Sequence, residues 1–121
     1  MINIINGKFK GKKIEVPDTK VRPTSSMKKE AIFSILESHA VNNNFNLYEG
    51  KCFIDLFAGS GSLGIESISR GASFAYFYEL NSNVLNILKK NCYKICAEDE
   101  YKIFNQNSTY VKKFKVNFPL S

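Results

Sequence analysis

The stretch that decides the fold is residues 52–64, which read CFIDLFAGSGSLG. Its first half is an apolar run of strand length, interrupted only by Asp55. Continuous apolarity indicates a strand that is buried on both faces, as in parallel sheets. Gly59, Gly61 and Gly64 then give the spacing G-x-G-x-x-G, and a predicted helix follows them. A strand, a glycine loop and a helix in this order predict a nucleotide-binding turn.

The segments beyond the glycine loop continue the alternation of strand and helix. Residues 74–78 form a second apolar run, and residues 101–104 form a third. Between them, Asn81 or Ser82 caps a predicted helix whose apolar side chains recur at helical spacing as far as Ile95. Strands that alternate with helices predict a parallel sheet, so the expected fold class is α/β with a doubly wound, Rossmann-like sheet.

Two acidic residues lie beside the glycine loop: Glu79 suits any nucleotide with a ribose, and Asp55 favours one class of nucleotide. Glu79 lies twenty residues after Gly59, at the end of the second predicted strand, where a carboxylate can accept hydrogen bonds from ribose hydroxyls. Asp55 precedes the loop, and its charge would repel the pyrophosphate of a dinucleotide. S-adenosylmethionine has no phosphate and carries a sulfonium and an ammonium group, so the same acid attracts it. We therefore expect S-adenosylmethionine rather than a nicotinamide or flavin dinucleotide. A tight turn in which the glycines serve only the backbone is the structural alternative.

The amino-terminal segment predicts a basic β-hairpin. Apolar residues alternate over residues 2–16, with breaks at Gly7 and Gly11, and Pro17 ends the pattern. The lysines of this hairpin are Lys8, Lys10, Lys12 and Lys13.

A helix is predicted after the hairpin. Thr24 or Ser25 is its expected N-cap, and it should end near Val41, before a run of asparagines. The apolar stripe expected on this helix consists of Met27, Ala31, Ile35 and Leu36.

The net charge of +6 is distributed unevenly along the chain. Residues 1–30 contain eight basic and three acidic residues, for +5, and residues 31–101 contain five basic and eight acidic residues, for −3. Residues 102–121 contain four basic and no acidic residues, for +4. A basic arm beside an acidic middle favours a polyanion such as RNA as the partner of the arm. Compositional drift of a lysine-rich sequence is the alternative.

Composition and length indicate one globular domain and exclude several other classes. The chain has 121 residues, of which 44% are hydrophobic and 23% charged, so it is not a disordered tail. No run of eighteen apolar residues occurs, so no transmembrane span is expected. The start, MINIINGKFKGKK, lacks the basic-then-apolar order of a signal peptide, and a cytoplasmic location is therefore expected.

The cysteines and the single histidine argue against three kinds of site. Cys52, Cys92 and Cys96 are odd in number and form no Cys-x-x-Cys pair. A disulfide framework, a zinc finger and a histidine-based triad are therefore disfavoured, and no metal site is expected. We expect the cysteines to be small core residues, and His39 to lie at the surface or at a helix end.

Three segments together resemble a known family. They read GKFKGKKIEVP, RPTSSMKKEAIFSIL and DLFAGSGSLGIESISRGA, and in this order and spacing they are similar to the bacterial 16S rRNA guanine-N2 methyltransferases. The resemblance runs from about Ile2 to Asn107. The Arg22-Pro23-Thr24 element makes it specific, because the glycine loop alone would indicate only a class I methyltransferase.

The resemblance implies a set of site residues and a domain organisation. Residues 1–45 would be an extension formed by the basic hairpin and a helix, and residues 46–121 the first part of the S-adenosylmethionine-binding methyltransferase domain. The implied cofactor-binding residues are Asp55, Phe57, Gly59, Ser60, Gly61, Glu79 and Asn107, where Asn107 replaces the aspartate frequent in the family. The implied RNA-facing residues are Lys8, Lys10, Lys12, Lys13 and Arg22. The expected partner is 16S rRNA or an assembly intermediate of the small ribosomal subunit.

One element of the family is missing. The resemblance implies an Asp/Asn-Pro-Pro-aromatic element after the fourth strand, which binds the target amine and stacks the flipped base. The only late proline is Pro119, without a second proline or a preceding strand. We therefore assign no catalytic residue and expect an incomplete sheet with an unpaired edge. Three interpretations stay open: a shortened and inactive methyltransferase, one half of a split enzyme that needs a complementing carboxyl-terminal chain, and a non-catalytic RNA-binding module.

Overall fold

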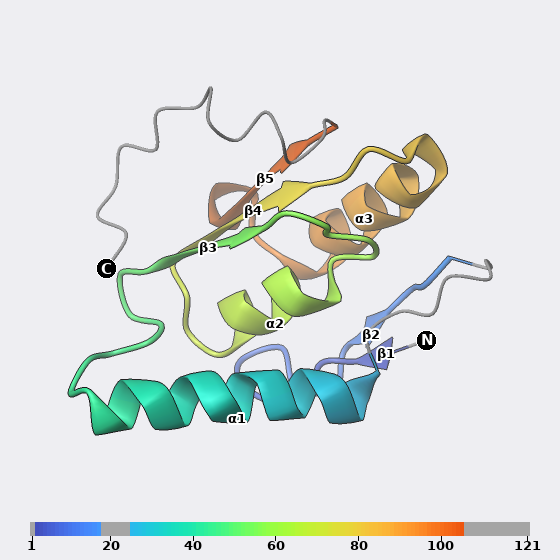
Figure 1. Cartoon of the computed structure of the whole chain (residues 1–121). Coiled ribbons are helices and arrows are strands. Elements are labelled where there is room, and N and C mark those ends of the chain that lie inside the picture. Colours follow the sequence, from blue (N-terminus) through green and yellow to red (C-terminus); the bar gives the residue numbers. More distant parts are fainter. Residues whose placement is uncertain (1, 18–24, 106–121) are drawn as a thin grey trace.

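The computed structural model describes residues 2–17 and 25–105, and it contains a parallel sheet with helices on one side of it (Figure 1). The sheet has three strands in the order β3-β4-β5. These strands are β3 (Cys52–Asp55), β4 (Phe74–Tyr78) and β5 (Tyr101–Phe104), and both neighbouring pairs are parallel. The α/β fold class with a parallel sheet is confirmed, including the bounds of β4 and β5. Helices on both faces, as in a doubly wound sheet, stay a prediction.

The helices are α1 (Ser26–Asn42), α2 (Ser62–Ser69) and α3 (Ser82–Ile95), with a short 3-10 helix, η1 (Glu98–Glu100), before β5. Ser25 is the N-cap of α1 and Asn81 that of α3, so each helix begins at one of the two candidates that the sequence offered. Helix α2 lies between the sheet and α1 (Figure 1). Among the described residues, no helix is long and apolar enough to cross a membrane.

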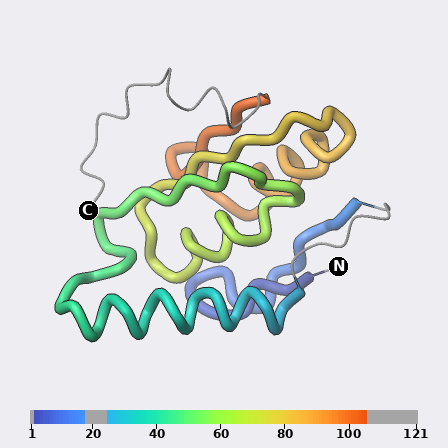
Figure 2. Tube along the Cα trace, viewed as in Figure 1, coloured from blue at the N-terminus to red at the C-terminus, as the bar shows by residue number. Residues whose placement is uncertain are grey.

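The amino-terminal segment forms the predicted hairpin, although its paired strands are short. Strands β1 (Ile2–Asn3) and β2 (Lys13–Ile14) are antiparallel, with Ile2 opposite Ile14. Figure 2 shows this hairpin in blue beside α2, from which it is far in sequence. Residues 2–17 are called the arm from here on. Its Ile4 and Ile14 are buried in the same apolar core as the side chains of α2, β4 and α3.

Two cysteines lie in that core, as expected, and the third lies at its margin. Cys92 and Cys96 are buried on α3 and after it, whereas Cys52 on β3 is half-buried. Burial raises the pKa of the Cys52 thiol to about 11, so this thiol is protonated at neutral pH. His39 is exposed in the last turn of α1, in agreement with the expectation.

The predicted apolar stripe of α1 is wrong. Met27 is 83% exposed and Ile35 is 69% exposed, and the helix instead buries Lys29, Phe33 and Ala40. The reason is that the Lys29 ammonium has an anionic partner inside the molecule. The spacing of apolar residues along α1 cannot reveal a partner that is far away in sequence.

Strand β3 is shorter than the apolar run that predicted it. The run continues to the glycine loop, but the strand ends at Asp55. The side chain of Asp55 accepts a hydrogen bond from the N–H of Phe57, at 3.2 Å from Oδ1 to N, which turns the chain out of the sheet. Leu56 and Phe57 therefore belong to the loop.

Candidate cofactor-binding site

The carboxyl ends of β3 and β4 bring the two predicted acidic residues to one edge of the sheet. Asp55 is the last residue of β3, and Glu79 directly follows β4. The two strands are parallel neighbours with Asp55 opposite Phe77, so both carboxylates lie at the same end of the sheet. In open α/β sheets this end is where ligands bind.

Backbone N–H groups of the glycine loop donate hydrogen bonds to Glu79 and to the end of β4. Oε1 of Glu79 accepts a hydrogen bond from the N–H of Gly59 at 2.9 Å, and the N–H of Ala58 donates to the carbonyl of Tyr78 at 3.0 Å. Oε2 of Glu79 also accepts from the N–H of Asn81 at 3.0 Å. Each oxygen of this carboxylate keeps a second lone pair, so Glu79 can accept further hydrogen bonds from a ligand.

The three glycines of the loop meet different needs. Gly59 and Gly61 have φ angles of +55° and +92°, which side chains rarely adopt. A Cβ at Gly64 would lie 2.2 Å from the ring of Phe77, so this glycine lets α2 approach β4 closely. A Cβ at Gly59 would meet no described atom within 4 Å. The backbone at Gly59 therefore borders open space where a ligand can lie.

One carboxylate oxygen of Asp55 accepts no hydrogen bond from the described residues. Its Oδ2 is buried and has no hydrogen-bond partner among the described residues. Burial raises the pKa of Asp55, and the charge of Glu79 raises it further, although the N–H of Phe57 opposes them. An unpartnered, buried carboxylate oxygen costs free energy in the absence of a donor, so this site suits a ligand with a cationic or N–H group.

Two large apolar side chains that follow the strand ends are exposed. Phe57 is 81% exposed and Leu80 is 63% exposed, and each follows one of the two acidic strand ends. Asn105 lies after β5, and its amide nitrogen donates to the carbonyls of Glu79 and Leu80 at 3.0 and 3.2 Å when its amide is oriented to satisfy both. Sequence reasoning did not identify Asn105. Its position directly after a strand end was the available signal.

Ser60, which the resemblance placed in the cofactor site, is buried within the loop. Its carbonyl accepts a hydrogen bond from Nδ2 of Asn91 on α3 at 2.8 Å.

Two further predicted residues, Asn107 and Arg22, lie outside the described residues. Among the described residues, no group of three or more His, Cys, Asp or Glu side chains is arranged to hold a metal ion.

The four lysines of the arm are exposed, and Lys8 has an acidic partner. Lys8 forms an ion pair with Glu100 of η1. Nζ of Lys8 and Nζ of Lys12 lie 5.0 and 5.5 Å from the ring centre of Phe9. Lys10 and Lys13 complete the exposed basic surface, which is where the sequence placed the RNA-facing residues.

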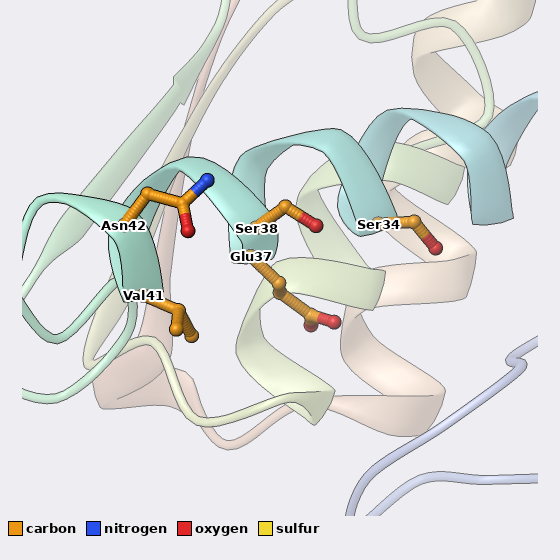
Figure 3. Close-up of a pocket in the computed structure, with 5 residues that line it drawn as sticks. All are labelled: Ser34, Glu37, Ser38, Val41 and Asn42. Carbon is orange, nitrogen blue, oxygen red and sulfur yellow. The ribbon is translucent and has the colours of Figure 1, made fainter.

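Two surface hollows lie away from the glycine loop. One has a volume of about 400 Å³ and lies along α1 (Figure 3), lined by Ser34, Glu37, Ser38, Val41 and Asn42. The other, of about 250 Å³, lies at the opposite end of the sheet, lined by Gly50, Lys51, Cys52, Ser73, Phe74 and Tyr76. None of the predicted cofactor residues lines either hollow.

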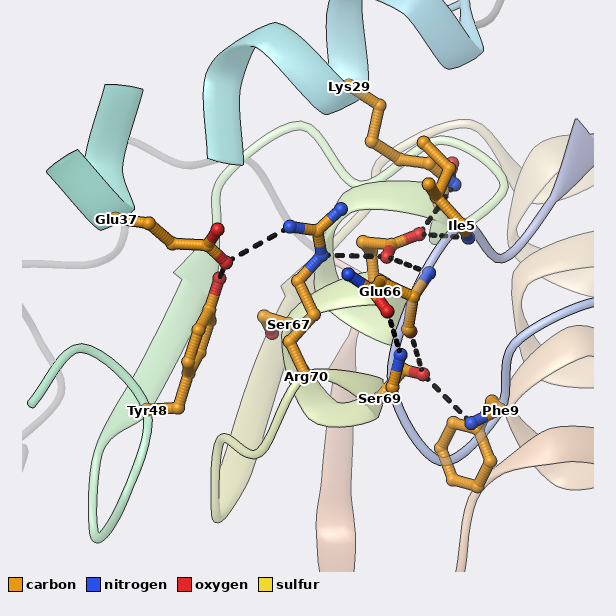
Figure 4. Close-up of polar contacts among 12 residues, drawn as sticks. Ile5, Phe9, Lys29, Glu37, Tyr48, Glu66, Ser67, Ser69 and Arg70 are labelled. Carbon is orange, nitrogen blue, oxygen red and sulfur yellow. Dashed lines mark hydrogen bonds and ion pairs between the residues drawn. The ribbon is translucent and has the colours of Figure 1, made fainter. Parts of the chain in front are cut away.

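A buried ionic network joins the arm, α1 and α2 (Figure 4). Glu66 of α2 pairs with Lys29 of α1 at 3.1 Å and with Arg70 at 2.8 Å, and its carboxylate also accepts hydrogen bonds from the backbone N–H groups of Ile5 and Asn6. Burial alone would raise the pKa of Glu66, but these donors and cations hold it below its ordinary value. Sequence reasoning missed this network.

The Lys29 ammonium is fully buried, and its three partners come from β1 and α2. Nζ donates to the carbonyl of Asn3 at 3.1 Å and to Oγ of Ser62 at 3.0 Å, besides its pairing with Glu66. Burial lowers the pKa of Lys29, and Glu66 opposes this shift. Because Ser62 is the first residue of α2, this network reaches the end of the glycine loop.

The parallel α/β sheet, the glycine loop and the acidic residues at two strand ends define the class of Rossmann-like nucleotide-binding proteins. Two solved structures share this fold. One from Escherichia coli, described as a candidate methyltransferase, yhhF, superposes with a TM-score of 0.73 at 30% identity and covers 91% of this chain and 55% of its own. The crystal structure of a candidate methylase, HI0767, from Haemophilus influenzae gives 0.66 at 34% identity, covering 96% and 57%.

The particular family follows from the sequence comparisons. The family model described as conserved hypothetical protein 95 matches residues 2–117, and the chain belongs to this family. Ribosomal RNA small subunit methyltransferase D of H. influenzae is 36% identical over 120 residues, covering 98% of this chain and 58% of that protein. The uncharacterized methylase RP545 of Rickettsia prowazekii is 39% identical over 114 residues, covering 93% and 48%. The chain thus spans about half the length of these curated relatives. The resemblance inferred from the residues is confirmed at the level of the family.

Proposed function

We propose that this chain provides the S-adenosylmethionine site and an RNA-facing arm of a methyltransferase that modifies the exocyclic N2 amine of a guanine in 16S rRNA. The observation that carries the cofactor assignment is the buried, unpartnered Oδ2 of Asp55 beside the open backbone of Gly59. The relatives named as rRNA methyltransferases support the reaction and the substrate.

The residues at the strand ends fit S-adenosylmethionine better than a dinucleotide. Asp55 would accept a hydrogen bond from the ligand's ammonium group, and Glu79 would accept hydrogen bonds from the ribose hydroxyls. Gly59 would allow the ligand to approach the backbone, and the exposed ring of Phe57 could cover it from one side. A pyrophosphate near Asp55 would be repelled. The bound cofactor supplies the methyl group, and the described residues bind and orient the cofactor.

The arm is the proposed contact with RNA. Lys10, Lys12 and Lys13 are exposed on it, and exposed lysines bind phosphates in a salt-dependent manner. The proposed partner is 16S rRNA or an assembly intermediate of the small subunit. We assign none of residues 1–121 to the binding of the target amine.

Calorimetry with the 121-residue chain tests the cofactor assignment. We expect binding of S-adenosylmethionine and no binding of NAD in the same preparation. Asp55→Asn should weaken the binding at least about tenfold, because a charge-assisted hydrogen bond contributes about 1.5–3 kcal/mol. Asp99→Asn in η1 is the matched control, since Asp99 is an exposed acid, and it should bind as the wild type does. Binding of NAD alone would overturn the proposal.

RNA binding and methyl transfer are tested separately. Affinity for unmethylated 16S rRNA should fall with salt, and replacing Lys10, Lys12 and Lys13 by alanine should weaken it and reduce the salt slope. The control replaces Lys89 and Lys94, which are exposed on α3. We expect no methyl incorporation by the chain alone. Salt-independent affinity would contradict the assignment of the arm, and methyl incorporation would contradict the expectation that residues 1–121 lack the catalytic element.

A further inference from the structure

Asn91 is a buried polar residue on the otherwise apolar face of α3. It is 2% exposed and lies among Leu88, Cys92 and Ile95, which are buried core residues. Its side-chain amide forms hydrogen bonds with both backbone groups of Glu15. Oδ1 accepts from the N–H of Glu15 at 3.0 Å, and Nδ2 donates to the carbonyl of Glu15 at 2.8 Å. Asn91 thereby pairs with the arm as a neighbouring strand would.

The same amide also holds the glycine loop. Nδ2 of Asn91 donates to the carbonyl of Ser60 at 2.8 Å. Ser60 lies between Gly59 and Gly61, whose φ angles are positive. Glycines have more conformational freedom than other residues, so a fixed carbonyl between two of them restricts the loop. One side chain therefore fixes the end of β2 and the centre of the glycine loop.

Lys29 makes a corresponding connection from the other strand of the arm. Its ammonium joins the carbonyl of Asn3, in β1, to Oγ of Ser62, at the end of the glycine loop. Each strand of the arm is thus connected to the loop through one buried side chain. The two connections come from different helices, α3 and α1.

We propose that Asn91 is a positioning residue that couples the arm to the glycine loop, so that the order of either one depends on the other. This inference rests on the proposed function where it concerns ligands: a cofactor on the loop and RNA on the arm would each strengthen the binding of the other. The coupling is reciprocal because it is a free energy shared by two sites.

Hydrogen exchange of the ligand-free chain tests the coupling. Asn91→Leu removes all three hydrogen bonds at similar volume, and Asn91→Asp keeps the acceptor for Glu15 but directs a carboxylate oxygen at two carbonyls. Both should increase the exchange rates of Glu15 and of the Gly59–Gly61 amides by about tenfold, with little change in β4. The same substitutions at Asn86, which is exposed on α3, are the controls.

A variant of the arm tests the reciprocal direction. Gly7 lies in the arm, and a Cβ there would lie 1.9 Å from the carbonyl oxygen of Ser69, the last residue of α2. Gly7→Ala should undock the arm and increase exchange at Gly59–Gly61. Unchanged exchange at Gly59–Gly61 in both the Asn91 and the Gly7 variants would overturn the coupling. A uniform increase that includes β4 would also overturn it, because it would show only a global loss of stability.

Binding of S-adenosylhomocysteine separates this inference from the proposed function. The Asn91 variants should bind it about tenfold more weakly than the wild type and the Asn86 controls. Equal affinity of the Asn91 variants and the wild type would contradict the inference and leave the cofactor assignment intact. If the wild type does not bind this ligand, the cofactor assignment fails, and the ligand-free exchange rates still decide whether Asn91 couples the arm to the loop.

Discussion

At the scale of single residues, the charged form of Asp55 lowers the stability of the ligand-free chain and would bind a cation in the proposed complex. Oδ2 of its carboxylate is buried and has no partner among the described residues, and burial is the main cause of its raised pKa. A cation beside it would stabilise the charged form. The affinity for S-adenosylmethionine should therefore depend on the ionisation of Asp55.

The affinity should fall as the pH falls through the raised pKa of Asp55. Below that pKa the free protein holds a proton that the cationic ligand must displace, so affinity decreases by up to about tenfold per pH unit. Dissociation constants measured from neutral pH downward should show this decrease in the wild type. The Asp55→Asn variant should bind S-adenosylmethionine weakly, and its affinity should not decrease further as the pH falls. A wild-type profile as flat as that of Asp55→Asn would contradict the prediction.

Glu66 should contribute more to stability than its partner Lys29. Glu66→Gln leaves the buried cations Lys29 and Arg70 without their shared anion, and breaking a buried ion pair costs about 3–5 kcal/mol. Lys29→Met leaves Glu66 with Arg70 and two backbone donors, so it should cost less. Urea unfolding of both variants measures the two losses. An equal or greater loss for Lys29→Met would contradict the assignment of Glu66 as the centre of the network.

At the scale of elements, the arm is docked by its backbone onto the end of α2. The N–H of Lys8 donates to the carbonyl of Ser69 at 2.8 Å, and the N–H of Phe9 donates to Oγ of Ser69 at 2.9 Å. Oγ of Ser69 in turn donates to the carbonyl of Asn6 at 2.6 Å. This close approach requires a glycine at position 7.

Two glycines of the arm should respond differently to the same substitution. Gly7 and Gly11 have φ angles of +88° and +85°, so alanine strains both backbones alike, but only at Gly7 would the Cβ overlap Ser69. Gly11→Ala should cost about 1–2 kcal/mol, and Gly7→Ala clearly more. Thermal unfolding and limited proteolysis of the arm measure the difference. Equal losses would show that the arm is not docked through Gly7.

The elements that the sequence predicted correctly are determined by residues close to one another in the chain. The period of α3, the caps at Ser25 and Asn81, and the apolar run of β4 depend on neighbouring residues. The buried face of α1 does not, because Lys29 is buried through an anion thirty-seven positions away, on α2. The acidic strand ends could be predicted from the glycine loop, whereas Asn91 and Asn105 are defined by segments brought together only in the fold.

At the scale of the whole molecule, two acids give stability opposite dependences on pH. The raised pKa of Asp55 means that its contribution is fully present below its ordinary pKa of 3.8 and is lost as the pH rises through the folded value. The lowered pKa of Glu66 means that its contribution is present above its ordinary pKa of 4.5 and is lost as the pH falls through the folded value.

The free energy of unfolding should therefore rise as the solution is made mildly acidic and then fall at lower pH. Urea titrations from neutral pH downward measure this profile. Asp55→Asn should be more stable than the wild type at neutral pH, and its profile should lack the rise. The fall below the ordinary pKa of Glu66 should remain in that variant. A wild type that loses stability steadily from neutral pH would contradict the assignment of Asp55.

The docking of the arm also sets an order of events during protein synthesis. The hydrogen bonds of Ile5 and Phe9 join them to residues 61 and 60 positions later in the chain, and that of Glu15 reaches 76 positions. At about 5–20 residues per second, the ribosome needs roughly 3–12 s to add sixty residues. The arm thus leaves the ribosome seconds before the residues that it contacts. For those seconds its exposed lysines and apolar side chains are available to the nascent chain's surroundings, which include the RNA of the ribosome that makes it.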